Sequence, residues 1–174
     1  MRWWDQLGVG GEVLSLVGFA ITIYQLIKTK NAAVAAQEAA QRVAQAYLSK
    51  TRRSEVVANL EVLQGIPAST RKVMTRLPRS FRQADDLLRS WREHGQMVCE
   101  HCKLLDGRPD QFLFNLEESF RVAEGFRELL LTTPTDHDRL ARALEGAVLQ
   151  MEGIAYHIPF QIKEQQLAIA AGGV

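Results

Sequence analysis

The sequence predicts an all-α protein in which a single N-terminal transmembrane helix continues into a cytoplasmic antiparallel helical bundle. Three observations support this fold class: an apolar segment near the N-terminus, an alanine-rich stretch after it, and later segments whose apolar residues recur every three or four positions. No stretch alternates apolar and polar residues in the manner of a strand. We therefore expect a short extracytoplasmic tail at 1–8, the transmembrane helix at 9–28, an alanine-rich juxtamembrane helix at 29–50 and the bundle at 51–174.

The apolar segment Val9–Ile27 carries a single charge, Glu12. A helix that crosses a bilayer needs about 20 mostly apolar residues, with aromatic and basic residues at its ends. Such residues flank this segment: Trp3, Trp4, Tyr24, Lys28 and Lys30. Positive charge is concentrated after the segment, which predicts an inner-membrane protein with its N-terminus outside and its C-terminal domain in the cytoplasm. Two alternatives are a cleaved signal peptide with a site at 33–35 and a helix buried in a soluble core.

Small and polar residues follow one face of this segment at alternating steps of four and three, which is heptad spacing. Small residues on a membrane helix let other helices approach closely, so we expect a homo-oligomer that contacts itself through this face. In a dimer its polar members would hydrogen-bond across the contact, and in a larger ring they would line a hydrophilic constriction. The candidate residues for helix contact or a pore are Gly11, Ser15, Gly18, Thr22, Gln25 and Thr29.

The rest of the chain is expected to form the bundle. A short helix from Ser54 to Gln64 is predicted to end at 65–67, longer helices begin at Ser80 and Asp110, and a last long helix ends or kinks at Pro159. Apolar side chains at helical spacing predict the core of the three long helices. These are Phe81, Ala84, Leu88, Trp91, Val98, Cys102 and Leu105 in the first, Phe112, Leu116, Phe120, Ala123, Phe126 and Leu130 in the second, and Leu140, Leu144, Val148, Met151, Ala155 and Ile158 in the third.

Basic residues gather between positions 71 and 92, although the net charge of the chain is only +1. Arginine suits phosphate because its planar guanidinium donates two hydrogen bonds at once. Three interpretations are open: a phosphate-bearing ligand such as a nucleotide, lipid headgroups, or a solvated face that pairs with the more acidic C-terminal part. Nucleic acid is not expected, because aromatic residues are not interleaved with the basic ones. The candidates for anion binding are Arg71, Lys72, Arg76, Arg79 and Arg82.

Cys99, His101 and Cys102 form the one metal-like cluster of the sequence. Two cysteines at this spacing supply half of a zinc site, but the chain has no second motif of this kind to complete it. On a helix both cysteines continue the apolar stripe of Trp91 and Val98, so we interpret them as core residues. The chain also lacks a phosphate-binding loop, a dinucleotide fingerprint and a nucleophile elbow. We therefore predict no enzyme, no resident metal and no cofactor.

Two functions follow from these features. The first is an oligomeric membrane-anchored effector whose cytoplasmic bundle senses a signal, such as a phosphate-bearing ligand, and then perturbs or permeates the membrane. The layout of Val9–Ile27, the basic residues Lys28 and Lys30, and the helical domain after them resembles the small membrane effectors of bacterial anti-phage defence systems. That resemblance implies a domain that responds to cyclic nucleotides or to a sensor protein, and it transfers no functional residue. The second function is a non-enzymatic membrane-tethered adaptor that binds a cytoplasmic protein partner.

Overall fold

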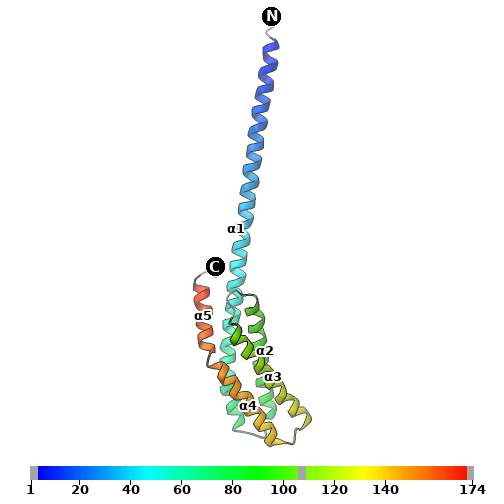
Figure 1. The fold of residues 1–174 in the computed structure, drawn as a ribbon, viewed down its shortest axis with the longest axis vertical. Coiled ribbons are helices and arrows are strands. Elements are labelled where there is room, and N and C mark those ends of the chain that lie inside the picture. Colours follow the sequence, from blue (N-terminus) through cyan, green and yellow to red (C-terminus); the bar gives the residue numbers. More distant parts are fainter. Residues whose placement is uncertain (1–3, 106–108, 172–174) are drawn as a thin grey trace. The chain divides into compact units, whose positions relative to one another are not determined.

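The computed structural model describes the backbone of residues 4–105 and 109–171, and the side chains of residues 19–105 and 109–171. These residues form helices and connecting turns and contain no strand, so the all-α prediction is confirmed (Figure 1). The helices are α1 (Trp4–Met74), α2 (Phe81–Lys103), α3 (Asp110–Thr132), α4 (His137–Ala155) and α5 (Ile158–Ala170).

The prediction of a transmembrane helix at 9–28 is wrong for the part of the chain that the structure describes. Within that part, no helix combines the length and the apolar character that a bilayer crossing requires. The side chains of Gly11, Ser15 and Gly18 lie outside the described residues.

The chain divides into two units, Met1–Gln45 and Ala46–Val174. The described part of the first unit is the beginning of α1, and all of its side chains from 19 to 45 are exposed. The second unit contains the rest of α1 and the four other helices. Among the residues whose burial the structure describes, all of the buried core residues belong to the second unit.

The core of the second unit confirms the apolar stripes of the three long helices. Nearly all of the predicted core side chains are buried, and only Leu130 and Ala155 are half-buried. α1 contributes a buried apolar stripe at Val56, Leu60 and Leu63, within the predicted short helix from Ser54 to Gln64. The largest fully buried side chains among the described residues include Leu60 and Leu63 on α1, Trp91 on α2, Leu116 and Phe126 on α3, Leu140, Leu144 and Met151 on α4, and Ile158 on α5.

α1 does not end at 65–67, as the sequence suggests, but continues through Pro67 to Met74. Proline lacks the N–H that would bond the carbonyl four residues earlier, which usually ends or kinks a helix. In α1 the neighbouring side chains Leu63, Ile66 and Val73 are all buried in the core. This packing holds the helix against the bundle on both sides of the proline.

Polar contacts fasten α1 to three other helices. His94 Nδ1 of α2 lies 2.8 Å from Asn59 Oδ1, and one heptad later His101 Nε2 lies 3.2 Å from Glu55 Oε2. On α4, Glu152 accepts two hydrogen bonds from Arg71, and on α5, Gln165 accepts one from Arg53. The part of α1 from Arg53 to Arg71 is therefore fixed to the bundle by its polar side chains as well as by its core stripe. A buried hydrogen bond from Trp91 Nε1 to Ser119 Oγ (2.8 Å) similarly joins α2 to α3.

Candidate functional site

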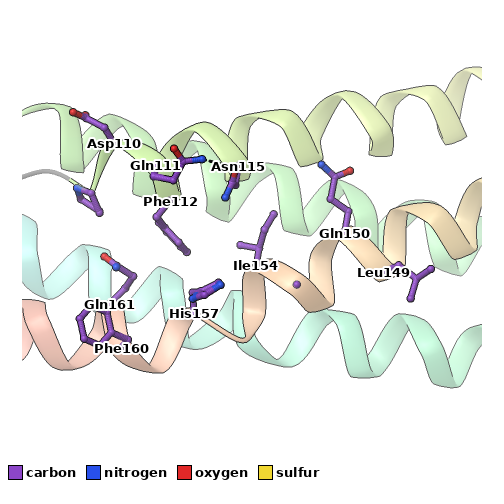
Figure 2. A pocket seen from close by; sticks show the side chains of 12 residues that line it. Asp110, Gln111, Phe112, Asn115, Leu149, Gln150, Ile154, His157, Phe160 and Gln161 are labelled. Carbon is purple, nitrogen blue, oxygen red and sulfur yellow. Dashed lines mark hydrogen bonds between the residues drawn. The ribbon is translucent and has the colours of Figure 1, made fainter.

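A pocket of about 670 Å³ lies where the beginning of α3, the end of α4 and the beginning of α5 meet. We call it the α3–α4–α5 pocket. Its volume falls within the range of roughly 300–1,000 Å³ that is typical of ligand sites. In Figure 2, Phe112 on α3 and Ile154 on α4 extend toward each other across it, and His157, Phe160 and Gln161 border it from the α5 side. The lining residues are Pro109–Phe112, Asn115, Leu149, Gln150, Gly153, Ile154, His157, Phe160 and Gln161.

The local sequence explains why the chain leaves this space open. Pro159 lies in the first turn of α5 and cannot donate to the carbonyl of Ala155, so α4 ends there and α5 starts as a separate helix. His157 is the residue before α5, and its backbone N–H bonds the Ile154 carbonyl at 2.9 Å. Gly153, one turn earlier, has no side chain, and a Cβ added there would meet nothing within 4 Å. The helix break and the glycine together leave the pocket unfilled.

The pocket has an apolar base and an apolar mouth. Phe112 and Ile154 are buried and form part of the core. In contrast, Leu149 is 57% exposed and Phe160 is 60% exposed, although both side chains are large and apolar. A molecule that enters the pocket can therefore cover two hydrophobic side chains that the fold leaves in contact with water.

Amide side chains supply most of the polar groups in the pocket. Gln111 Nε2 donates to Asn115 Oδ1 at 3.3 Å, and Gln150 and Gln161 also line the space. Gln161 is the most informative of these, because it is only 8% exposed and its side chain has no hydrogen-bond partner among the described residues. An amide offers two donor hydrogens and two acceptor lone pairs. Those of Gln161 stay within reach of solvent, because among the described residues Arg53 Nε is the one buried side-chain polar atom without a partner. The free hydrogen-bonding capacity of Gln161 is therefore available to whatever occupies the pocket.

The structure separates the predicted anion-binding residues. Arg71 bonds Glu152 through both Nε (2.6 Å) and Nη2 (2.7 Å). These hydrogen bonds raise the pKa of Arg71 and lower the pKa of Glu152. Lys72 and Arg76, one turn apart on the same side of α1, make no ion pair with any described residue.

Lys72 and Arg76 line a depression of about 250 Å³, which we call the Lys72–Arg76 depression. Ser69 and Gln83 contribute to its lining, and no carboxylate does. Arg79 and Arg82 line none of the pockets described here and are exposed. Farther along the basic stretch, Arg89 pairs with Asp85 and Asp86, and Arg92 pairs with Glu124.

The cysteines lie in the core. Burial raises the pKa of Cys99 to about 12 and the pKa of Cys102 to about 11, so both are neutral thiols at physiological pH. Within the described residues, no group of three or more His, Cys, Asp or Glu side chains is arranged to hold a metal ion. His101 is turned instead toward Glu55 of α1.

The polar members of the predicted helix-contact face are exposed on α1. Thr29 Oγ1 donates to the carbonyl of Gln25 at 2.7 Å, which is a bond within its own helix. Thr22 is also exposed and has an interaction of its own.

The residues of the α3–α4–α5 pocket were not predicted from the sequence. The sequence pattern identifies Phe112 as a core residue, but Gly153 and Gln161 belong to no motif. The one local signal is Pro159, which indicates a helix break at the place where the pocket opens. Comparisons of the chain with models of protein families, with curated proteins and with solved structures found no match.

Proposed function

We propose that this protein is a non-enzymatic binding module whose α3–α4–α5 pocket receives an apolar peptide segment of a partner protein. The observation that carries this proposal is the pocket itself, about 670 Å³ in volume, in which the solvent-accessible amide of Gln161 lies beside the apolar side chains of Phe112 and Ile154. A peptide group matches an amide well, because each offers one carbonyl acceptor and an N–H donor. The proposal keeps the adaptor function that the sequence suggested, without a transmembrane helix.

The hydrophobic surface around the pocket favours a protein over a small molecule. Tyr156 is 82% exposed and Leu167 is 60% exposed, so apolar surface extends beyond the pocket from the end of α4 along α5. Leu149 and Phe160 add to it at the pocket mouth. Contiguous apolar surface with a polar surround is typical of a protein-binding site. A partner that places one large side chain in the pocket and lies across this surface would cover all four side chains.

A pair of glycine substitutions tests this proposal. Gly153→Leu places a branched side chain in the pocket, and Gly146→Leu makes the same change one heptad earlier in α4, outside the pocket. A Cβ at either position meets nothing within 4 Å, and leucine favours a helix more than glycine does by roughly 0.8 kcal/mol. Both variants should therefore be at least as stable as the wild type, and only Gly153→Leu should block binding.

The probe is a phage-displayed library of random peptides selected on the full chain. We expect selected peptides to share a large aromatic or aliphatic residue, and Gly153→Leu to weaken their binding by at least about tenfold relative to Gly146→Leu. Gln161→Leu should also weaken binding, because it removes the amide and retains the volume. A selection that yields no binder, or binders that Gly153→Leu leaves unaffected, would contradict the proposal.

A second candidate function is anion binding at the Lys72–Arg76 depression. The specific observation is that two neighbouring cations without a carboxylate partner line the same space together with the hydroxyl-bearing Ser69 and the amide of Gln83. Lysine binds a phosphate group through the compact charge of its ammonium, and arginine donates two parallel hydrogen bonds from its planar guanidinium.

The test is the thermal shift of the full chain with inorganic phosphate and with cyclic and linear nucleotides. We expect stabilisation that is lost in a Lys72→Ala, Arg76→Ala double variant. It should be retained in Arg82→Ala, which removes an exposed arginine outside the depression. The absence of a shift, or an equal loss in Arg82→Ala, would leave Lys72 and Arg76 as surface charges.

A further inference from the structure

The beginning of α1 exposes every side chain that the structure describes, from Phe19 to Gln45. In proteins, a helix is stabilised mainly by packing of an apolar face rather than by its intrinsic propensity. This segment has no buried side chain, yet Phe19 is 65% exposed, Leu26 is 68% exposed and Ile27 is 54% exposed. Clustered side chains of this size are rarely left uncovered.

The large apolar side chains are concentrated on one face of the segment. Because an α-helix turns by about 100° per residue, five of them fall within an arc of about 100°. We call this arc the aliphatic face, and its members are Phe19, Ile23, Leu26, Ile27 and Val34. Ile21 lies on the opposite side of the helix, and Gln25 and Thr29 also lie outside the arc. The aliphatic face is therefore distinct from the small and polar face that the sequence pattern emphasised.

We propose that the aliphatic face binds the same face of a second copy of this chain in a parallel two-helix coiled coil. Three members of this face, Phe19, Ile23 and Leu26, begin a heptad repeat with steps of four and three. The repeat continues through 30, 33, 37, 40 and 44, and Ile27 and Val34 flank it. Burial of the five large side chains would remove roughly 500 Å² of surface per copy, or about 1,000 Å² for two copies. That total reaches the size that a specific interface needs.

The distribution of side chains along the face favours the parallel arrangement. Its large residues lie between 19 and 27, whereas the later positions of the repeat include Ala33, Ala40 and Ala44. In a parallel pair the large side chains lie against each other while the helices overlap along the whole repeat from 19 to 44. An antiparallel pair with the same overlap would place them against alanines. Lys30 and Gln37 also occupy inner positions of the repeat, and polar residues there fix the register of a two-stranded coil.

Two isoleucine variants with the same chemistry separate this face from the rest of the helix. Ile23→Glu places a carboxylate on the aliphatic face, and Ile21→Glu places one on the opposite side. By sedimentation equilibrium of the full chain, we expect a dimer for the wild type and for Ile21→Glu. For Ile23→Glu we expect a dissociation constant at least about tenfold higher, because each dimer loses two buried isoleucines. A monomeric wild type, or an equal effect of the two variants, would overturn the proposal.

Disulfide cross-linking tests the parallel register. In Leu26→Cys the two introduced thiols of a parallel dimer lie opposite each other, and copper phenanthroline can oxidise them to an intermolecular disulfide. Ile21→Cys is the control, because its thiols face away from the contact. The native cysteines give little background, since both are buried. Efficient cross-linking of Leu26→Cys alone supports the parallel pair, and a dimer that Leu26→Cys does not cross-link would contradict it.

Discussion

At Gly95 the packing of the structure leaves no room for a side chain. This glycine lies inside α2 and is buried against α3. A Cβ added there would lie 2.6 Å from both Cε1 and Cζ of the Phe120 ring, and 3.4 Å from Leu116 Cδ1. Favourable contacts between carbon atoms begin near 3.5 Å, so the ring would have to move by about 1 Å. Phe120 is itself buried and Leu116 is fully buried beside it, which leaves the ring little room.

The magnitude of the effect follows from two opposing contributions. Replacing glycine by alanine inside a helix stabilises a protein by about 1 kcal/mol through backbone conformation. Overpacking a core position costs about 1–3 kcal/mol. We therefore expect Gly95→Ala to lower the free energy of unfolding by about 1 kcal/mol. Gly146→Ala, at an open position of α4, should instead raise it by roughly 0.5–1 kcal/mol.

Urea unfolding followed by circular dichroism measures both variants under the same conditions. A double-mutant cycle with Phe120→Leu identifies the cause, because a smaller side chain should relieve the contact and recover about 1 kcal/mol in the Gly95→Ala background. If Gly95→Ala stabilised the protein as much as Gly146→Ala does, the close packing of α2 against α3 at this point would be refuted.

Three further predictions concern the buried hydrogen bond, the ion pair and the thiols. Ser119→Ala should lower the free energy of unfolding by about 1–2 kcal/mol, because it leaves the indole N–H of Trp91 without its acceptor, and a Trp91→Phe background should reduce that loss. Glu152→Gln should lower the urea midpoint at pH 7, and the difference from the wild type should shrink as the pH falls below about 4. This sign follows because the bonds from Arg71 lower the pKa of Glu152, so the pair stabilises the fold above the ordinary carboxyl pKa and is lost as the pH falls through the lowered value. The two native thiols should react with Ellman's reagent at pH 8 at least about 100-fold more slowly in the folded chain than in urea, and comparable rates would contradict their burial.

The sequence was sufficient to predict the core of the bundle, because helical periodicity is a local signal. Apolar residues recur at steps of three and four along each long helix, and members of these stripes such as Phe112, Phe126 and Leu144 are buried as that spacing predicts. The path of α1 was less predictable. Pro67 is a helix breaker in isolation, and only the burial of the side chains around it explains why the helix continues. Tertiary packing outweighs the local signal at this position.

The candidate site could not have been predicted in the same way. Phe112, Gly153 and Gln161 come from three helices, and no spacing in the sequence indicates that they meet. A glutamine is informative only when its burial and its missing partner are known, and both are properties of the packed structure. The basic stretch from 71 to 92 is a case in which composition alone was misleading. Its composition suggested one anion site, but Arg71 forms an ion pair with Glu152. Whether a basic side chain pairs within the protein or is left to bind a ligand depends on which carboxylates lie within its reach.

The division of the chain at Ala46 has a consequence for how this protein can change. Among the residues whose side chains are described, the first core residue is Val56 and the last is Ile158, so the described part of the bundle core contains no side chain from 19–45. Substitutions within 19–45 therefore leave the packing of the described core untouched. The two parts of the gene can be altered independently, with the bundle constrained by its interior and the leading helix constrained only by what it contacts.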